Sequence, residues 1–499
     1  MTLPPQTPDQ AAPPESGAAA PDGDHPHALR TLALASLGAF VVFLDTTIVN
    51  VAFEAISRSY HSDTDRLAWV LNAYSLVFAA ALIPAGRLAD RYGRRRLFLL
   101  GISGFAVMSA LCGLAPNAGV LIGARGLQAA FAALITPTSL ALILPEFPPH
   151  RRPFAIGTWG SMGALAAALG PTIGALLTQY ADWRWIFLIN VPICAAIVLF
   201  GLRTLHESRD PHAEGLPDPL GVLLIAAMPA ALSFAIIEGP RWGWTDGRVL
   251  GAFTLTVVLL PLFLLRCRAA ARPAIDLALF TVRQFRLVNA ATLIFAAAFY
   301  GTLLSNIIFL QTVWHYSVLS AALATSPGPL LVAVIARFST RLAHRYGPRP
   351  VLSIGGVFYA GGLAVYAGAS GAHAQWLTHW LPASLLVGVG IGMTLPVQSS
   401  AAVQALPSGR FALGSAINAS FRQLGAVLGI SLFVAILGSP APGRALGAFH
   451  DVWWLFGALG LAAAAVLWLP RLRPAGPAAA RAGESGAPGA EQPAAASAR

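Results

Sequence analysis

Apolar runs long enough to cross a membrane recur along almost the whole chain, with short polar segments between them. A helix needs about 20 apolar residues to span the hydrocarbon core of a bilayer. The pattern therefore predicts an all-α integral membrane protein. Fourteen spans are predicted, at residues 31–52, 67–86, 97–115, 119–143, 155–177, 184–202, 219–237, 249–265, 288–311, 321–338, 351–370, 380–402, 412–436 and 450–469.

The composition agrees with that class of protein. Of the 499 residues, 56% are hydrophobic and only 11% are charged, whereas soluble domains carry about 25% charged residues. Residues 1–30 and 471–499 are rich in Pro and Ala. The first of these segments lacks the basic start and short apolar core of a signal peptide. We predict that both are disordered cytoplasmic tails.

Every basic residue is an arginine, since the sequence contains no lysine. An ATPase with a P-loop lysine and an enzyme with a Schiff-base lysine are therefore disfavoured. Cys112, Cys194 and Cys267 lie far apart, in or beside apolar runs, so no disulfide or zinc framework follows from their positions. We predict no metal site, no cofactor and no enzymatic activity.

The positions of the arginines predict the orientation of the chain, because short cytoplasmic loops retain positive charge. With the first tail inside, 24 arginines lie in inside segments and 6 lie in outside loops, while Arg125 and Arg422 fall within spans. Both termini are then cytoplasmic. The net charge of +11 is explained by this topology, so binding to nucleic acid is not needed to account for it.

The chain repeats itself at long range. "RLADRYGRR" (87–95) and "RLAHRYGPR" (341–349) agree at seven of nine positions, and each follows the second helix of a block of six. We predict two six-helix bundles, 31–203 and 288–470, with two extra helices in the segment 204–287 between them. Paired halves around a central path are a transporter architecture.

Two opposite charges are predicted at similar depth in the first bundle. Asp45 lies about 7 residues, or roughly 10 Å, from the outer end of its helix, and Arg125 lies about 6 residues from the same face. Ionisable groups inside membranes face the bundle interior and tend to pair. Asp45 and Arg125 are thus candidates for coupling transport to protons, and a purely structural ion pair is the alternative. Gln128 shares a helix face with Arg125.

Several motifs are similar to those of one family. "GRLADRYGRRR" (86–96) resembles the loop signature of the major facilitator superfamily. Six further segments resemble the drug:proton antiporter branch with fourteen spans. They are "LDTTIVNVAF" (44–53), "WVLNAYSL" (69–76), "GARGLQAA" (123–130), "ALGPTIGA" (168–175), "WRWIFLINVPI" (183–193) and "GSAINASFRQLGAVLG" (414–429).

The resemblance implies proton-driven export of small, often amphipathic molecules by alternating access, with Asp45 as the proton-coupling residue. It also implies a gating role for the loop that contains Gly86, Asp90, Arg91, Gly93 and Arg94, and a basic loop that only sets topology is the alternative. The helix with Gly163, Gly170, Pro171 and Gly174 resembles the antiporter motif that limits proton leakage. Its small residues also suit ordinary close packing.

Three positions depart from the family pattern: Glu54 stands where proline is usual, Ala129 replaces a glycine, and His344 replaces the aspartate in the second loop copy. A mostly apolar cavity with few polar groups suits promiscuous ligands. Each polar candidate for its wall could equally be an interfacial aromatic or a contact between helices. The candidate cavity residues are Trp69, Asn72, Tyr74, Gln128, Tyr300, Asn306, Gln311, Gln398, Asn418 and Arg422.

The leading hypothesis is thus a monomeric proton-coupled exporter in the inner or plasma membrane, whose partners are the lipid bilayer, protons and a small-molecule substrate. A periplasmic adaptor would leave no sign in this sequence. A proton-coupled uptake symporter is one alternative. A membrane sensor or scaffold without transport is the alternative from another class, and the repeated halves with buried charges argue against it.

Overall fold

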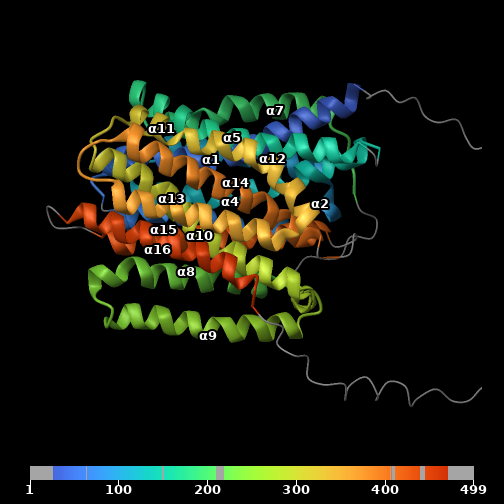
Figure 1. Ribbon diagram of the computed structural model, residues 1–499. Coiled ribbons are helices and arrows are strands. Elements are labelled where there is room, and N and C mark those ends of the chain that lie inside the picture. Colours follow the sequence, from blue (N-terminus) through green and yellow to red (C-terminus); the bar gives the residue numbers. More distant parts are fainter. Residues whose placement is uncertain are drawn as a thin grey trace, which may run out of the picture.

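The computed structural model describes residues 26–62, 64–148, 151–209, 218–404, 406, 411–438 and 444–469. This part of the chain consists of helices joined by short turns and loops, and it contains no strands (Figure 1). Most of the predicted tails lies outside the described residues. The first helix nevertheless begins at Pro26, inside the segment predicted as a tail. The first half contains α1 (Pro26–Tyr60), α2 (Thr64–Tyr92), α3 (Arg94–Gly113), α4 (Ala118–Ile143), α5 (Arg152–Tyr180), α6 (Trp185–Leu188) and α7 (Asn190–Thr204).

The rest of the chain continues the same antiparallel arrangement. Two helices, α8 (Pro219–Trp242) and α9 (Gly247–Ala269), follow the first half. The second half contains α10 (Arg283–Thr312), α11 (Val318–Thr325), α12 (Pro327–Tyr346), α13 (Pro348–Ala369), α14 (Leu381–Gln404), α15 (Phe411–Leu437) and α16 (Ala445–Val466). Short 3₁₀ turns lie at Leu144–Glu146 and Leu277–Thr281, and a π-helical turn at Trp376–Trp380 leads into α14.

Each of the fourteen predicted spans falls on a helix or on a pair of consecutive helices. Thirteen stretches of the described chain are long and apolar enough to cross a membrane, and two of them join α6 with α7 and α11 with α12. The remaining predicted span, 155–177, falls within the 29 residues of α5. The break between α11 and α12 comes at Pro327, which is the first residue of α12 and a favourable position for proline.

The first helix is longer than the sequence predicted. Its apolar run ends at Phe53, but α1 continues to Tyr60. Glu54 and Arg58 form an ion pair of 2.8 Å at i,i+4 in these last turns, a spacing that supports a helix. Asp45 therefore lies 15 residues from the end of α1, and the prediction that this helix ends near residue 52 was wrong.

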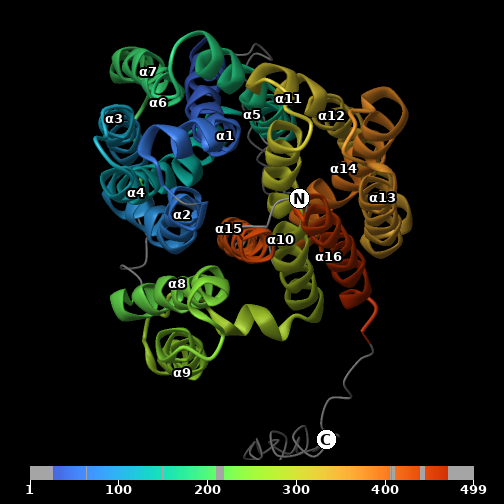
Figure 2. The ribbon, with the colours of Figure 1, turned by 90° about the vertical axis from the view of Figure 1, so that its left-hand side faces the viewer.

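The helices form two groups around a common centre when the molecule is viewed along their axes (Figure 2). In the first group α1 packs on α5 and α4, α2 packs on α4, and α3 packs on α4 and α7. In the second group α10 packs on α15 and α16, α13 packs on α14 and α16, and α12 packs on α14. The exact domain boundaries of the sequence analysis stay a prediction.

The two extra helices are central in the sequence but peripheral in space. Figure 2 shows α8 beside α2 and α15, with α9 on its outer side. Asp218 and Arg266 join the two helices at one end, with Arg266 Nε 2.7 Å from Asp218 Oδ2 and Arg266 Nη2 2.8 Å from Asp218 Oδ1. These hydrogen bonds from Arg266 lower the pKa of Asp218 to about 2. The helices α8 and α9 thus form an antiparallel hairpin that an ion pair holds together at its open end.

We call the end of the helices at which Gly93 lies the loop end, and the opposite end the far end. Hydrogen bonds join the two halves toward the far end. Gln179 Oε1 on α5 accepts from the backbone N–H of Leu319 at 3.0 Å, and Gln311 Nε2 on α10 donates to the Val51 carbonyl at 3.5 Å. The structure therefore holds the halves together at the far end.

The first testable prediction concerns sidedness: the loop end is cytoplasmic. The native cysteines are all buried, so a single introduced cysteine can be labelled above a low background. We expect Tyr92→Cys, at an exposed position of the loop end, to react with an impermeant maleimide only after the cells are permeabilised. Tyr180→Cys, exposed at the far end, should react in intact cells. The reverse labelling pattern would invert the topology.

Candidate functional site

Asp45 and Arg125 form a fully buried ion pair in the first half. Arg125 Nη1 on α4 lies 2.5 Å from Asp45 Oδ2 on α1, and the two side chains are 1% and 0% exposed. Two amides complete the surroundings of the carboxylate, since Gln128 Nε2 and Asn190 Nδ2 each donate to Asp45 Oδ1 at 3.2 Å. Helices α1, α4 and α7 thus converge on one carboxylate.

A second layer of hydrogen bonds positions these amides. Ser109 Oγ on α3 accepts from Gln128 Nε2 at 3.2 Å and from Asn190 Nδ2 at 3.0 Å, and donates to the Phe187 carbonyl at 2.8 Å. Gln128 Oε1 accepts from Arg125 Nη1 at 2.7 Å. Because buried polar groups need partners, this layer fixes the orientation of every donor that faces Asp45.

Asn190 and Ser109 were not predicted from the sequence. Asn190 lies in the quoted run "WRWIFLINVPI", where it is the only amide side chain. An amide in such an apolar run signals a buried polar contact. Ser109 gives no such signal, because a serine in a membrane helix can satisfy its hydroxyl within its own helix.

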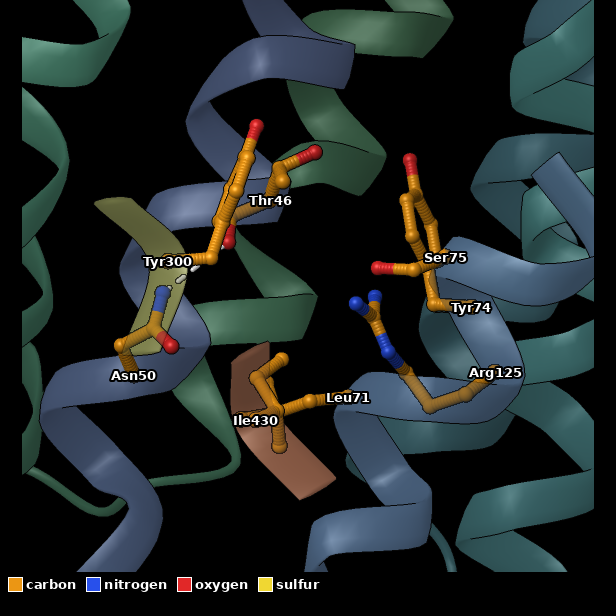
Figure 3. A pocket seen from close by; sticks show the side chains of 8 residues that line it. All are labelled: Thr46, Asn50, Leu71, Tyr74, Ser75, Arg125, Tyr300 and Ile430. Carbon is orange, nitrogen blue, oxygen red and sulfur yellow. Dashed lines mark hydrogen bonds between the residues drawn. The ribbon is translucent and has the colours of Figure 1, made fainter. Parts of the chain in front are cut away.

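The Arg125 guanidinium also forms part of the wall of a small pocket between the halves (Figure 3). Arg125 stacks over the ring of Tyr74 with 4.1 Å between the guanidinium carbon and the ring centroid. Its Nε is buried without a hydrogen-bond partner among the described residues. The lining comes from α1, α2, α4, α10 and α15: Thr46, Asn50, Leu71, Tyr74, Ser75, Arg125, Tyr300 and Ile430.

This pocket is too small for a drug-sized molecule in the present conformation. Its free space is about 10 Å³, close to the minimum that holds one water molecule. Typical ligand pockets are ≈ 300–1,000 Å³. Because residues of both halves line the pocket, its size depends on how the two halves are placed relative to each other.

Of the candidate cavity residues, Tyr74 and Tyr300 line this pocket. Others are occupied by contacts between helices. Asn306 Oδ1 accepts from Trp453 Nε1 at 2.9 Å, Asn418 Nδ2 donates to Asn289 Oδ1 at 3.1 Å, and Asn72 bonds to serines of two other helices. Trp69 packs against the apolar core, Gln398 is buried, and Gln311 lies near the far end beside Glu54. Arg422 is half-buried on α15, within electrostatic reach of Tyr300.

The α2–α3 loop has a backbone that only glycine adopts without strain. Gly93 has φ 115° and ψ 129°, in the half of φ space that L side chains avoid. Asp90 accepts two hydrogen bonds from Arg94, from Nε at 3.0 Å and from Nη2 at 2.9 Å. The two charges on either side of Gly93 are therefore joined within the loop.

Glu207, which was not predicted, binds the other side of this loop. Its carboxylate accepts from the backbone N–H groups of Arg95 at 3.1 Å and Arg96 at 3.3 Å, in the first turn of α3. A carboxylate is favourable at a helix N-terminus. A Cβ added at Gly93 would lie 2.5 Å from Glu207 Oε1. The segment after α7 thus leaves room at this position for glycine only.

The second copy of the loop has the same backbone but lacks these contacts. Gly347 has φ 84°, and a Cβ at this position would meet nothing within 4 Å. His344 stands in the place of Asp90. The two copies therefore share a turn, and among the described residues only the first copy shows the aspartate–arginine pair and the glutamate.

The helix that resembles the antiporter motif packs closely against α1 beside Asp45. A Cβ at Gly174 would lie 2.7 Å from Ile48 Cγ1, and one at Gly163 would lie 3.1 Å from the Phe43 ring. A Cβ at Gly170 would collide with Thr47. These glycines let the backbone of α5 approach α1, and Pro171 lies inside α5 between two of them.

Comparisons with known proteins agree with this architecture. A family model described as Major Facilitator Superfamily matches residues 35–430. A "Multidrug resistance protein Stp" of Mycobacterium tuberculosis is 34% identical over 82% of this chain and 76% of its own length. A "Puromycin resistance protein pur8" of Streptomyces alboniger is 35% identical over 85% and 84%, respectively.

A third relative, a "Tetracenomycin C resistance and export protein" of Streptomyces glaucescens, is 32% identical over 85% of this chain and 78% of its own length. Among solved structures, a POT family transporter in complex with 5-aminolevulinic acid has a TM-score of 0.65 at 14% identity, over 89% of this chain and 96% of that one. At that identity the likeness concerns the fold alone.

Proposed function

The chain belongs to the major facilitator superfamily and is a transporter of the drug-efflux type, and on that premise we propose that it exports small amphipathic molecules in exchange for protons. The observation that carries this proposal is the Asp45–Arg125 pair at the wall of a pocket lined by both halves. The protein would lie in the plasma membrane with both termini in the cytoplasm. The proton gradient would drive it without a cofactor.

Asp45 is suited to carry a proton because the hydrogen-bond donors around it stabilise the charged form, and the neutral form needs fewer of them. As a carboxylate it accepts hydrogen bonds from Arg125, Gln128 and Asn190, which offsets the cost of a charge in low dielectric. As a neutral acid it needs fewer of these donors. Protonation therefore loosens the hold of Asp45 on Arg125.

Arg125 links this event to the pocket. Its guanidinium contacts Asp45 on one side and lies in the pocket wall on the other, stacked on Tyr74 (Figure 3). A change in the Asp45–Arg125 pair thus alters the charge presented to a bound molecule. Exchange follows if substrate and proton favour opposite conformations, because two ligands that favour different states oppose each other's binding.

Alternating access supplies the motion that this exchange requires. The halves are joined toward the far end by Gln179–Leu319 and Gln311–Val51, and the pocket between them has little free space. Opening of one end and closing of the other would enlarge the pocket and change which side it faces. The relatives' names suggest antibiotics as first test molecules.

The test is transport by the purified full-length protein in proteoliposomes loaded with a pH-sensitive dye. We expect puromycin or tetracenomycin C to move against its gradient when a proton gradient of opposite direction is imposed, and protons to move the other way. Cells that express the protein should tolerate more of the same compound. Substrate and protons moving in the same direction would indicate an uptake symporter and contradict the proposal.

A further inference from the structure

The inserted helix α8 lies in the seam between the two halves. It packs against α2 of the first half and α15 of the second, and α9 covers its outer side (Figure 2). Its residues Leu224 and Ile225 share an apolar cluster with Ile83 of α2 and Ile417 of α15. Nearer the far end, Ile237 belongs to the large core cluster. A part of the chain outside both repeats therefore contacts both.

Three buried polar side chains meet in this seam, one from each helix. Asn72 Nδ2 on α2 lies 3.1 Å from Ser233 Oγ on α8 and 3.1 Å from Ser431 Oγ on α15, and the two hydroxyls are 2.5 Å apart. All three side chains are fully buried. We call Asn72, Ser233 and Ser431 the three-helix clasp.

The hydrogen-bond donors and acceptors of the clasp fit one arrangement. Ser431 Oγ donates to the Val427 carbonyl of its own helix at 2.7 Å, so its single proton is used there. Ser233 must then donate to Ser431, and the two N–H groups of Asn72 serve the two serines. Ser233 is thus both acceptor and donor between the two halves.

The clasp is not fully satisfied, which suits a contact that must break. Asn72 Oδ1 is buried without a hydrogen-bond partner among the described residues. If the amide were turned, its nitrogen would be the atom without one. An unsatisfied buried group lowers the stability of the conformation that contains it. A second conformation that hydrates Asn72 removes this cost.

The position of the clasp shows which motion would break it. Asn72 is 8 residues from the far-end start of α2, Ser431 is 6 residues from the far-end terminus of α15, and Ser233 is 9 residues from that of α8. The hydrogen bonds that join α5 to α11 and α10 to α1 lie toward the same end. Separation of α2 from α15 at the far end would therefore pull the clasp apart.

We infer that Ser233 makes the inserted helix pair part of the gate: the three-helix clasp holds the far end closed and opens when the two halves part there. This inference rests on the alternating access of the proposed function. Through Ser233, α8 bonds to both halves at once, so the insertion stabilises the conformation that is closed at the far end. Removal of the Ser233 hydroxyl shifts the equilibrium toward the conformation that is open at the far end.

The experiment measures distances between spin labels on the full-length protein by pulsed electron resonance. Arg66 on α2 and Arg444 at the start of α16 are exposed at the far end and belong to different halves, so cysteines at these positions carry the labels. Serines replace the three native cysteines. Ser233→Ala removes two hydrogen bonds, and we expect it to raise the ratio of long to short distances by at least roughly two- to tenfold, the effect of losing one of them.

Ser431→Ala should shift the ratio in the same direction, and the double variant should shift it by less than the product of the single effects, because the two hydroxyls share one contact. Thr254→Ala is the matched control. Its hydroxyl donates only to the Leu250 carbonyl within α9 and faces outward, so we expect no shift.

The outcomes separate the inference from the function on which it rests. In one outcome, the wild-type protein shows both distances and their ratio changes with pH or substrate, but Ser233→Ala and Ser431→Ala behave like Thr254→Ala. This outcome would contradict the role of the clasp and leave the proposed export function intact. If the wild-type protein keeps one distance under all conditions, the result contradicts alternating access and, with it, the role of the clasp in closing the far end.

Discussion

Asp45→Asn is expected to reduce pH-driven export on the order of 100-fold or more, to the level of protein-free vesicles, because the residue can no longer exchange a proton. The substitution keeps the shape of the side chain, and its Oδ1 can still accept from Arg125. Its new amide would face the donors of Gln128 and Asn190, but Asn190 can turn, since its own Oδ1 has no partner among the described residues. Export driven by an imposed pH gradient is the measurement.

A loss of folding must be separated from a loss of coupling in this experiment. Asp45→Asn leaves the buried Arg125 without its counter-charge, and breaking a buried pair costs about 3–5 kcal/mol. The double variant with Arg125→Gln removes both charges and should recover much of that stability, as measured by thermal unfolding in detergent, while export stays absent. Asp45→Glu should keep partial activity with a changed pH profile.

Export by Asp45→Asn at the wild-type rate under a pH gradient would place the coupling site elsewhere. Asp45 would then be the structural partner of Arg125. Glu54 is the next acid along α1, and it forms an ion pair with Arg58 at i,i+4, about one turn further on. Glu54→Gln would be the next variant in the same assay.

Gly93→Ala is expected to lower the export rate by about tenfold or more, because two independent costs meet at this position. The backbone has a positive φ that costs an L residue of order 1–3 kcal/mol. The new Cβ would also lie 2.5–2.8 Å from the Glu207 carboxylate. This collision would push the carboxylate away from the backbone N–H groups in the first turn of α3. A cost of about 1.4 kcal/mol changes an equilibrium tenfold, so either effect is large enough to disturb the movement that the gating hypothesis assigns to this loop.

The second loop copy provides the matched control for this variant. Gly347→Ala carries the cost of positive φ without a collision, since no atom of the described residues lies within 4 Å of its Cβ. The difference between the two variants therefore isolates the contact with Glu207. Gly93→Ala combined with Glu207→Ala should recover part of the lost export. Equal, small effects of Gly93→Ala and Gly347→Ala would show that the glutamate has no role in transport.

The sequence predicted the helices well because the membrane imposes one dominant requirement, a long apolar run. It was less informative where a helix continues beyond that run, as α1 does through Glu54 and Arg58 to Tyr60. The facing depth of Asp45 and Arg125 could be predicted from the direction of their helices. Their contact is confirmed as a distance of 2.5 Å, whereas the role of the pair in coupling stays a prediction.

The contacts that the sequence could not predict involve small polar residues with many possible partners. Ser109, Ser233 and Ser431 read as neutral positions in apolar runs, and only the packing of the helices decides which acceptor each one meets. Glu207 follows a helix in a segment of mixed charge, where nothing in the spacing shows that it folds back onto the start of α3. Asn72 was predicted to face the cavity, but its amide lies in the seam beside α8.

The separation of Asp45 and Arg125 by 80 positions has a consequence for biogenesis. Synthesis delivers α1 to the membrane before α4 exists, so the carboxyl group must first cross the insertion machinery without its counter-charge. On biological insertion scales an aspartate at mid-helix costs about 2.5–3.5 kcal/mol. The nascent α1 must therefore keep this group protonated, hydrated or sheltered until α4 emerges. We therefore expect the pairing of these charges in the first bundle to begin during synthesis, before the second half has been made.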